Sequence, residues 1–331
     1  MKPYKTGFVL GKFCPPHKGH LYLIDVAKTN CDTIYVAIDN IMDDIFPLEK
    51  RKEWISKIFP EVNVLILPMP LPQDPSETPN FWNIWRKAIR HFIKVKIDCV
   101  FASENYGYKL ANELEADFYP VDLNRTKIPV SATSIRNDIF NNWDFLPFVV
   151  QNDLKASICI FGPESTGKTT LSRQLADFFN CPLVPEFAEE VIRNKKGNIS
   201  LEDMKFIAFE QDNRLKQLQK RINPLLIADT DAITTKLWIR ELFDEYPGYI
   251  EKIIKQQKFD LYLLMDIDLE WENDIHRYRP EGRKEFFENC KKTLELYQRP
   301  FRIITGRGES RFKNALNAIY SRFPYLCIKQ S

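Results

Sequence analysis

The chain has 331 residues, enough for two domains that each bury a core of their own. Its 47 basic and 45 acidic side chains leave a net charge of +2, so no global field favours nucleic acid or an anionic membrane as a partner. Hydrophobic residues make up 44% of the chain, and no run of about 18 apolar residues suggests a membrane span. No apolar leader precedes the first predicted strand, so we expect a cytoplasmic protein.

The first half alternates short strand patterns with helical ones. Strands are predicted at residues 6–13, 33–39, 62–67 and 98–102, and helices at 17–28, 48–59, 81–94 and 105–114. This alternation predicts an α/β fold, a doubly wound parallel sheet covered by helices on both faces, over residues 1–150. Ligands of such sheets bind at the carboxyl ends of the strands, near the switch point.

A second cycle begins at residues 155–162 and predicts a second doubly wound domain over residues 151–331. Its further elements are predicted at 169–180, 181–184, 200–222, 223–231, 259–268 and 301–306. The boundary is expected between Asn142 and Ala156, although no Gly/Ser-rich linker marks it.

The seven cysteines are dispersed along the chain and form no CxxC pair. A disulfide framework and a thiolate zinc site are therefore not expected, and we predict reduced, mostly buried thiols.

Residues 162–169, GPESTGKT, fit the pattern G-x-x-x-x-G-K-[ST] between a predicted strand and a predicted helix. Glycines let such a loop wrap around a polyphosphate, the lysine reaches the β and γ phosphates, and the hydroxyl holds Mg²⁺. We therefore predict an ATP site with Mg²⁺ as the cofactor of ATP. Its predicted residues are Gly162, Glu164, Ser165, Thr166, Gly167, Lys168, Thr169 and Thr170.

Acidic residues follow the next two predicted strands of this half. Glu186 follows the second strand, while Asp229 and Asp231 end the third. Asp229 is placed to anchor the metal together with Thr169, and Glu186 or Asp231 to orient an attacking hydroxyl. Alternatively, Glu186 or Asp231 merely caps the next helix.

Basic residues gather between a later strand and helix, at Arg277, Arg279 and Arg283. They are placed like a mobile lid that closes on phosphates, and an ordinary solvated basic face is the alternative.

The loop after the first strand, GKFCPPHKGH at residues 11–20, carries His17 and His20 where a helix is predicted to begin. Zinc would need a third ligand, and neither His91 nor His276 lies in a ligand-like neighbourhood. Imidazoles at a helix N-terminus are able to donate hydrogen bonds to phosphate oxygens, although a structural role is the alternative.

The stretch VSATSIRND at residues 130–138 supplies further phosphate donors near the end of this half. Ser131 and Thr133 present hydroxyls at a predicted helix start, and Arg136 lies on its first turn.

Together, GKFCPPHKGH and VSATSIR resemble the HxGH and ISxTxIR motifs of the nucleotidyltransferase superfamily, with Val130 in place of isoleucine as the one departure in the second motif. Followed by a P-loop half, they make the chain resemble the NadR family, in which nicotinamide mononucleotide (NMN) adenylyltransferase is fused to ribosylnicotinamide kinase. The resemblance runs from Thr6 to about Phe323. Some members of the family begin with a helix-turn-helix DNA-binding domain. Only a few residues precede the first predicted strand here, so we do not expect transcriptional repression from the resemblance.

The resemblance implies two reactions: NMN and ATP give NAD and pyrophosphate in the first half, and nicotinamide riboside is phosphorylated by ATP in the second. It assigns the first ATP to Gly11, Lys12, Phe13, His17, His20, Ser131, Thr133 and Arg136. In the second half it assigns ATP to the P-loop, with Arg277 and Arg279, and the catalytic roles to Lys168 with Glu186 or Asp231.

Trp82 and Trp85 lie three apart on one predicted helix, where they offer a ring for nicotinamide or simply pack in the core. Alternatives for the whole chain are the same fusion acting on another nucleotide, and a regulator that senses ATP or NAD without turnover. A homo-oligomer is compatible with the sequence, which does not determine the oligomeric state.

Overall fold

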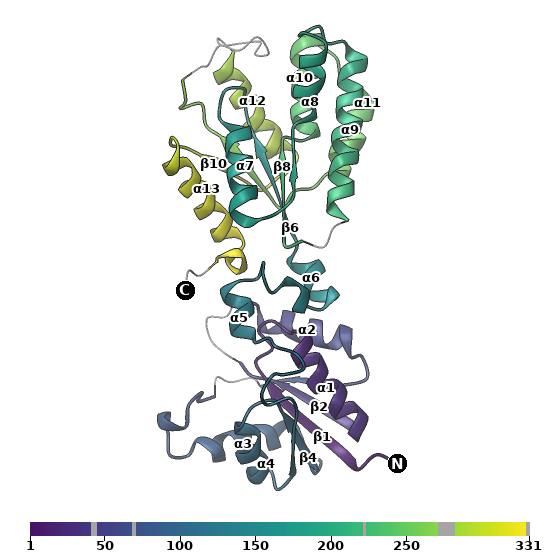
Figure 1. Ribbon diagram of the computed structural model, residues 1–331, viewed down its shortest axis with the longest axis vertical. Coiled ribbons are helices and arrows are strands. Elements are labelled where there is room, and N and C mark those ends of the chain that lie inside the picture. The colour runs from purple at the N-terminus through teal and green to yellow at the C-terminus, as the bar shows by residue number, and fades with distance from the viewer. Residues whose placement is uncertain (41–44, 68–70, 221–222, 271–281, 329–331) are drawn as a thin grey trace. The chain divides into compact units, whose positions relative to one another are not determined.

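A computed structural model describes residues 1–40, 45–67, 71–220, 223–270 and 282–328 of the chain (Figure 1). Its internal contacts define two units, one over Met1–Asp153 and the other over Leu154–Cys327. Each unit holds a five-stranded sheet in which every pair of neighbouring strands is parallel. The predicted α/β class with two parallel sheets is confirmed.

The first sheet has the strand order β3-β2-β1-β4-β5, which places β1 beside the point where the order reverses. Its strands are β1 (Tyr4–Gly11), β2 (Cys31–Ile38), β3 (Asn63–Ile66), β4 (Cys99–Ala102) and β5 (Asp117–Pro120). The helices of this unit are α1 (Lys18–Asn30), α2 (Leu48–Ile58), α3 (Phe81–Phe92), α4 (Tyr106–Glu113), α5 (Ala132–Asn137) and α6 (Phe148–Leu154). Three short 3₁₀ helices of the described chain are η1 (Pro75–Glu77) and η2 (Trp143–Phe145) here and η3 (Pro324–Leu326) in the second unit.

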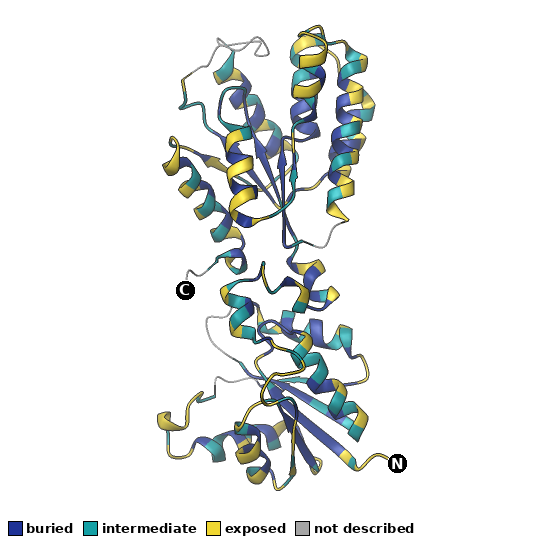
Figure 2. Ribbon diagram, viewed as in Figure 1, coloured by how far each residue is buried: buried dark blue, intermediate teal, exposed yellow. Residues whose placement is uncertain are grey.

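Alternating side chains of β1 feed two separate cores, one on each face of the sheet. Val9 packs with residues of α1 and α2, whereas Phe8 and Leu10 pack with residues of α3 and α4. Since successive side chains of a strand point to opposite faces, both faces of this sheet are covered, and its central strands β1, β2 and β4 are mostly buried (Figure 2).

The second sheet has the order β10-β9-β6-β8-β7, with β6 at its centre. Its strands are β6 (Ala156–Phe161), β7 (Leu183–Val184), β8 (Leu225–Asp229), β9 (Leu261–Met265) and β10 (Phe301–Ile304). Its helices are α7 (Lys168–Phe179), α8 (Phe187–Asn194), α9 (Leu201–Gln219), α10 (Ala232–Phe243), α11 (Gly248–Gln256), α12 (Arg283–Leu296) and α13 (Glu309–Arg322).

Most predicted elements are present, with boundaries that differ by a few residues. One strand of the first sheet was not predicted. This is the edge strand β5, whose residues are only half-buried or exposed and therefore give no strand pattern in the sequence. The seven cysteines are free thiols, and five of them are buried. Among the described residues, no helix has both the length and the apolar character that crossing a bilayer requires.

Candidate active sites

The first unit contains a cavity of about 620 Å³ at the carboxyl ends of its strands. It is lined by every residue that the sequence assigns to the first ATP and to NMN, namely Gly11, Lys12, Phe13, His17, His20, Trp82, Trp85, Ser131, Thr133 and Arg136. The structure therefore brings together two motifs that are more than a hundred residues apart in the chain.

His17 and His20 form a stacked pair at the start of α1, with ring centroids 3.7 Å apart. His17 is the N-cap of the helix, and its backbone N–H donates to Nδ1 of His20 at 3.3 Å. Burial, helped by the charge of Arg125, lowers the pKa of His17 to about 3. Burial, His17 and Arg125 likewise hold the pKa of His20 well below its usual value. Both rings are therefore neutral, and because Nδ1 of His20 accepts a hydrogen bond, the proton of this ring lies on Nε2.

Arg136 joins the second motif to the histidine loop. Its Nη1 donates to the carbonyl of Cys14 at 2.7 Å, and its Nη2 donates to the hydroxyl of Thr133 at 3.1 Å. Ser131 caps α5, because its hydroxyl accepts the backbone N–H of Ser134 at 3.0 Å. The local fold thus fixes the guanidinium and two hydroxyls of this motif at one wall of the cavity.

The two tryptophans lie on α3, where they contribute to the core and also lie at the cavity. Trp85 is buried in the core, and its Nε1 donates to the carbonyl of Pro72 at 3.0 Å. Trp82 is half-buried and packs edge-on against Phe81, with ring centroids 4.9 Å apart. Both side chains also line the cavity, so each presents part of a ring to a ligand.

Four charged residues of this cavity, Asp39, Glu104, Asp122 and Arg125, are missed by the sequence analysis. Arg125 donates to the carboxylate of Glu104 at 2.9 Å. Its loop is fixed by Asp122, whose carboxylate accepts three consecutive backbone N–H groups downstream. Asp39 directly follows β2. Its position at a strand end was the available signal, whereas nothing in the sequence marked Arg125.

The second unit contains a cavity of about 710 Å³, lined by the P-loop residues from Glu164 to Thr170 together with Glu186. Gly162 begins the loop at φ +137°, where a Cβ atom would lie 3.1 Å from the carbonyl oxygen of Met265. Only glycine suits this backbone and this approach. Lys168 donates to the carbonyl of Pro163 at 3.0 Å, which holds its ammonium group over the loop.

The acidic residues of this unit differ in their hydrogen bonds. Asp231 caps α10: its Oδ1 accepts the backbone N–H groups of Ile233 and Thr234, and its Oδ2 accepts the hydroxyl of Tyr262 at 2.8 Å. Burial raises its pKa to about 6. Glu186 precedes α8 without a side-chain capping bond and lines the cavity. The structure thus has the capping arrangement at Asp231 and not at Glu186.

Burial also raises the pKa of Glu186, with the charge of Asp229 adding to the rise and that of Lys168 opposing it. Asp229 is buried, and its Oδ2 accepts the hydroxyl of Ser172 at 3.3 Å. Its Oδ1 has no hydrogen-bond partner among the described residues. An orphaned carboxylate oxygen close to the Thr169 hydroxyl is a donor set that suits Mg²⁺.

Of the predicted basic lid, Arg277 and Arg279 lie outside the described residues. Arg283 begins α12, and it donates to the carbonyls of Leu269 at 2.8 Å and of Ser165 at 3.0 Å. It therefore contacts the P-loop directly instead of belonging to a solvated basic face.

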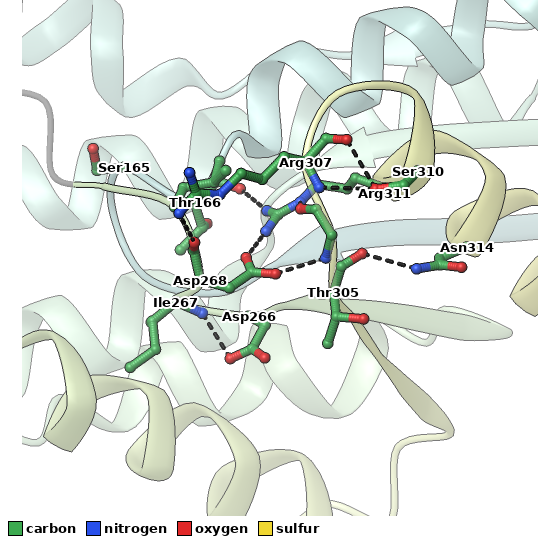
Figure 3. A network of polar contacts seen from close by, with 12 residues as sticks. Ser165, Thr166, Asp266, Ile267, Asp268, Thr305, Arg307, Ser310, Arg311 and Asn314 are labelled. Atoms are coloured by element: carbon green, nitrogen blue, oxygen red, sulfur yellow. Dashed lines mark hydrogen bonds and ion pairs between the residues drawn. The ribbon is translucent and has the colours of Figure 1, made fainter.

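A buried arginine that the sequence analysis did not single out links four segments around the P-loop (Figure 3). Arg311 of α13 is 4% exposed and donates to the carbonyl oxygens of Thr166 and Gly306 and to the carboxylate of Asp268. Asp268 also accepts the backbone N–H of Gly306. The loops after β9 and β10 are thereby tied to the P-loop through one guanidinium group.

Comparison with known proteins places these features in context. A model of the AAA domain family matches residues 157–311. The trifunctional NAD biosynthesis/regulator protein NadR of Escherichia coli K12 is 24% identical over 95% of this chain and 82% of its own length. NadR of Salmonella typhimurium LT2 is also 24% identical, over 81% of this chain and 70% of its own.

A crystal structure of NadR protein in complex with NR has the same fold, with a TM-score of 0.50 and 23% identity over 97% of both chains. The chain is therefore similar to NadR over about 95% of its length, and its C-terminal half matches the AAA domain family.

Proposed function

We propose that the chain is a bifunctional enzyme of NAD synthesis. The second unit transfers the γ-phosphoryl group of ATP to nicotinamide riboside, and the first unit joins the resulting NMN to the adenylyl group of a second ATP. One observation carries this proposal: each unit has its own cavity, and each cavity is lined by residues predicted to bind phosphate, all of them in the first unit and Glu164 to Thr170 in the second. The similarity to NadR, crystallised with NR, supports the choice of substrates.

In the first unit, a phosphate oxygen of NMN bonds to the α-phosphorus of ATP as the bond to pyrophosphate breaks. No proton has to move, so the residues act by orientation and by stabilising charge. The neutral His20 donates from Nε2 to the triphosphate, and Arg136 neutralises the leaving pyrophosphate. The two tryptophans hold the pyridine ring by contact with its faces or edges.

In the second unit, the 5′-hydroxyl oxygen of the riboside bonds to the γ-phosphorus as the bond to ADP breaks. The hydroxyl proton goes to Glu186, whose raised pKa suits a group that accepts a proton near neutral pH. Lys168 holds the transferred phosphoryl group. Mg²⁺, when bound with ATP, neutralises phosphate charge, and Thr169 and Asp229 are the residues that would hold it.

The test is a single incubation of the purified chain with nicotinamide riboside, ATP and Mg²⁺, in which NMN and NAD are both measured. Lys168→Ala should abolish riboside phosphorylation and leave NAD synthesis from added NMN intact, whereas His20→Ala should do the reverse. Loss of both activities in either variant would contradict two separate sites. If neither product forms with the wild-type chain, a fusion acting on another nucleotide or an ATP-sensing regulator replaces this proposal.

A further inference from the structure

A buried carboxylate oxygen in the first cavity has no role in the reaction described above. Asp39 follows β2 and is only 3% exposed. Its backbone is held on both sides, since its N–H donates to the carbonyl of Gly11 at 3.0 Å and its carbonyl accepts Nη1 of Arg51 at 3.3 Å. Its side-chain Oδ1, however, has no partner among the described residues. A buried acceptor without a donor is costly, which suggests that a ligand supplies the donor.

This carboxylate lies at the end of the cavity that Trp85 lines. The indole of Trp85 donates to the carbonyl of Pro72, and the next residue, Gln73, hydrogen-bonds the carboxylate of Asp39 and lines the same cavity. Asp39 also lies beside the loop after β1, because Nη1 of Arg51 donates both to its carbonyl and to the carbonyl of Lys12. Its carboxylate therefore lies between the predicted ATP loop and Gln73, which connects it to the end of the cavity where the proposed function places the pyridine ring of the mononucleotide.

The substituent on that ring decides which partner suits the site. Nicotinamide carries a carboxamide with two N–H donors, whereas nicotinate carries a carboxylate that only accepts at neutral pH. The charges closest to Asp39 are those of Lys12 and Arg51, which favour its ionised form, while its burial acts in the opposite direction and raises its pKa. Two carboxylates brought together in a buried site would repel each other.

We propose that Asp39 determines specificity in the adenylyl transfer: its Oδ1 accepts an N–H of the NMN carboxamide and excludes nicotinate mononucleotide. This inference rests on the function proposed above for the first unit. The competing role is a hydrogen bond to a ribose hydroxyl, which an acidic residue after the second strand makes in many dinucleotide-binding sheets. The ribose is identical in both mononucleotides, so that role does not discriminate between them.

Asp39→Asn tests the inference, because asparagine keeps the volume and adds an amide that donates to a carboxylate. The matched control is Asp32→Asn, the same change at the exposed, opposite end of β2. We expect the kcat/KM ratio of NMN to nicotinate mononucleotide to fall at least about tenfold in Asp39→Asn and to stay unchanged in Asp32→Asn. An unchanged thermal transition of the first unit in both variants, measured by calorimetry, shows that this unit is folded, and riboside phosphorylation by the other unit should also be unchanged.

An unchanged ratio in Asp39→Asn, or equal use of both mononucleotides by the wild-type chain, would overturn the inference. An equal loss with both substrates would point to the ribose instead. Calorimetric titration with each mononucleotide tests the role of Asp39 separately from the proposed NAD synthesis. Selective NMN binding that is lost in Asp39→Asn supports Asp39 even if no NAD forms, whereas NAD synthesis with an unaltered preference refutes Asp39 alone. If neither mononucleotide binds, both proposals fail.

Discussion

Glu186 and Asp231 are the two candidates for the base of the kinase reaction. We expect substitution of Glu186 to lower activity and substitution of Asp231 to lower stability. Glu186→Gln removes the proton acceptor and keeps the volume, so we expect riboside phosphorylation to slow by about 100- to 10,000-fold. This corresponds to roughly 3 to 5 kcal/mol on the barrier. Because Glu186 makes no side-chain capping bond, the thermal midpoint of the second unit should hardly change.

Asp231→Ala should instead reduce stability. The change removes the cap of α10, worth about 1 kcal/mol, and leaves the buried Tyr262 hydroxyl without its acceptor, which costs about 1 to 3 kcal/mol. The sum of roughly 2 to 4 kcal/mol lowers the midpoint by roughly 4 to 16 °C for a unit of this size. Turnover of the molecules that remain folded should fall less than about tenfold, since Asp231 does not line the cavity.

The assay couples ADP release to riboside phosphorylation below the unfolding transition, and calorimetry follows the two units as separate transitions. NAD synthesis from added NMN, measured on the same samples, is the internal control. The reasoning is refuted if Asp231→Ala abolishes phosphorylation at unchanged stability while Glu186→Gln retains it.

Three further outcomes are expected. Burial raises the pKa of Asp231 in the folded state to about 6, above its pKa of about 4 in the unfolded chain. The stability gained from this difference is complete below a pH of about 4 and is lost as the pH rises to about 6. Asp231→Asn should flatten this decline in the free energy of unfolding, measured by denaturant titrations of the second unit. Arg311→Met should raise the KM for ATP in riboside phosphorylation by about tenfold or more, because the P-loop carbonyl of Thr166 loses its hydrogen-bond donor. Arg311→Lys keeps a donor, so its KM for ATP should lie between those of Arg311→Met and the wild-type chain. No proton uptake by the two histidines should accompany ATP binding to the first unit at neutral pH, because burial holds the pKa values of His17 and His20 low and both rings bind while neutral. Calorimetry in buffers of different ionisation enthalpy measures this, and proton uptake on binding would contradict the role of His20 as a neutral donor.

The two domains and most of the site residues were predictable because their signals are local. A P-loop is eight residues long, and its spacing follows from the shape of a polyphosphate. The HxGH loop is equally short, and its place after the first strand directed attention to the strand ends. Edge strand β5 lacked such a signal, because its residues are not buried and periodicity detects only burial.

Contacts between distant segments were out of reach of the sequence. Arg311 contacts Thr166, which lies 145 residues earlier, and one arginine among many on a helix does not reveal its partner. Arg125 is likewise positioned by a loop that Asp122 folds through backbone hydrogen bonds. Such contacts depend on tertiary geometry, which neither periodicity nor spacing encodes.

Hydrogen bonding separates structural from ligand-facing carboxylates where burial does not. Asp39, Asp229 and Asp231 are all at most 3% exposed, and all three lie at or just beyond the carboxyl end of a strand. Only Asp231 has both oxygens bonded by its own chain, whereas Asp39 and Asp229 each keep one oxygen without a partner among the described residues. Since a buried acceptor is stable only when a donor or a cation reaches it, the unpartnered oxygens mark where ligands belong. The sequence placed all three at strand ends, but it could not tell which of them the fold itself would satisfy.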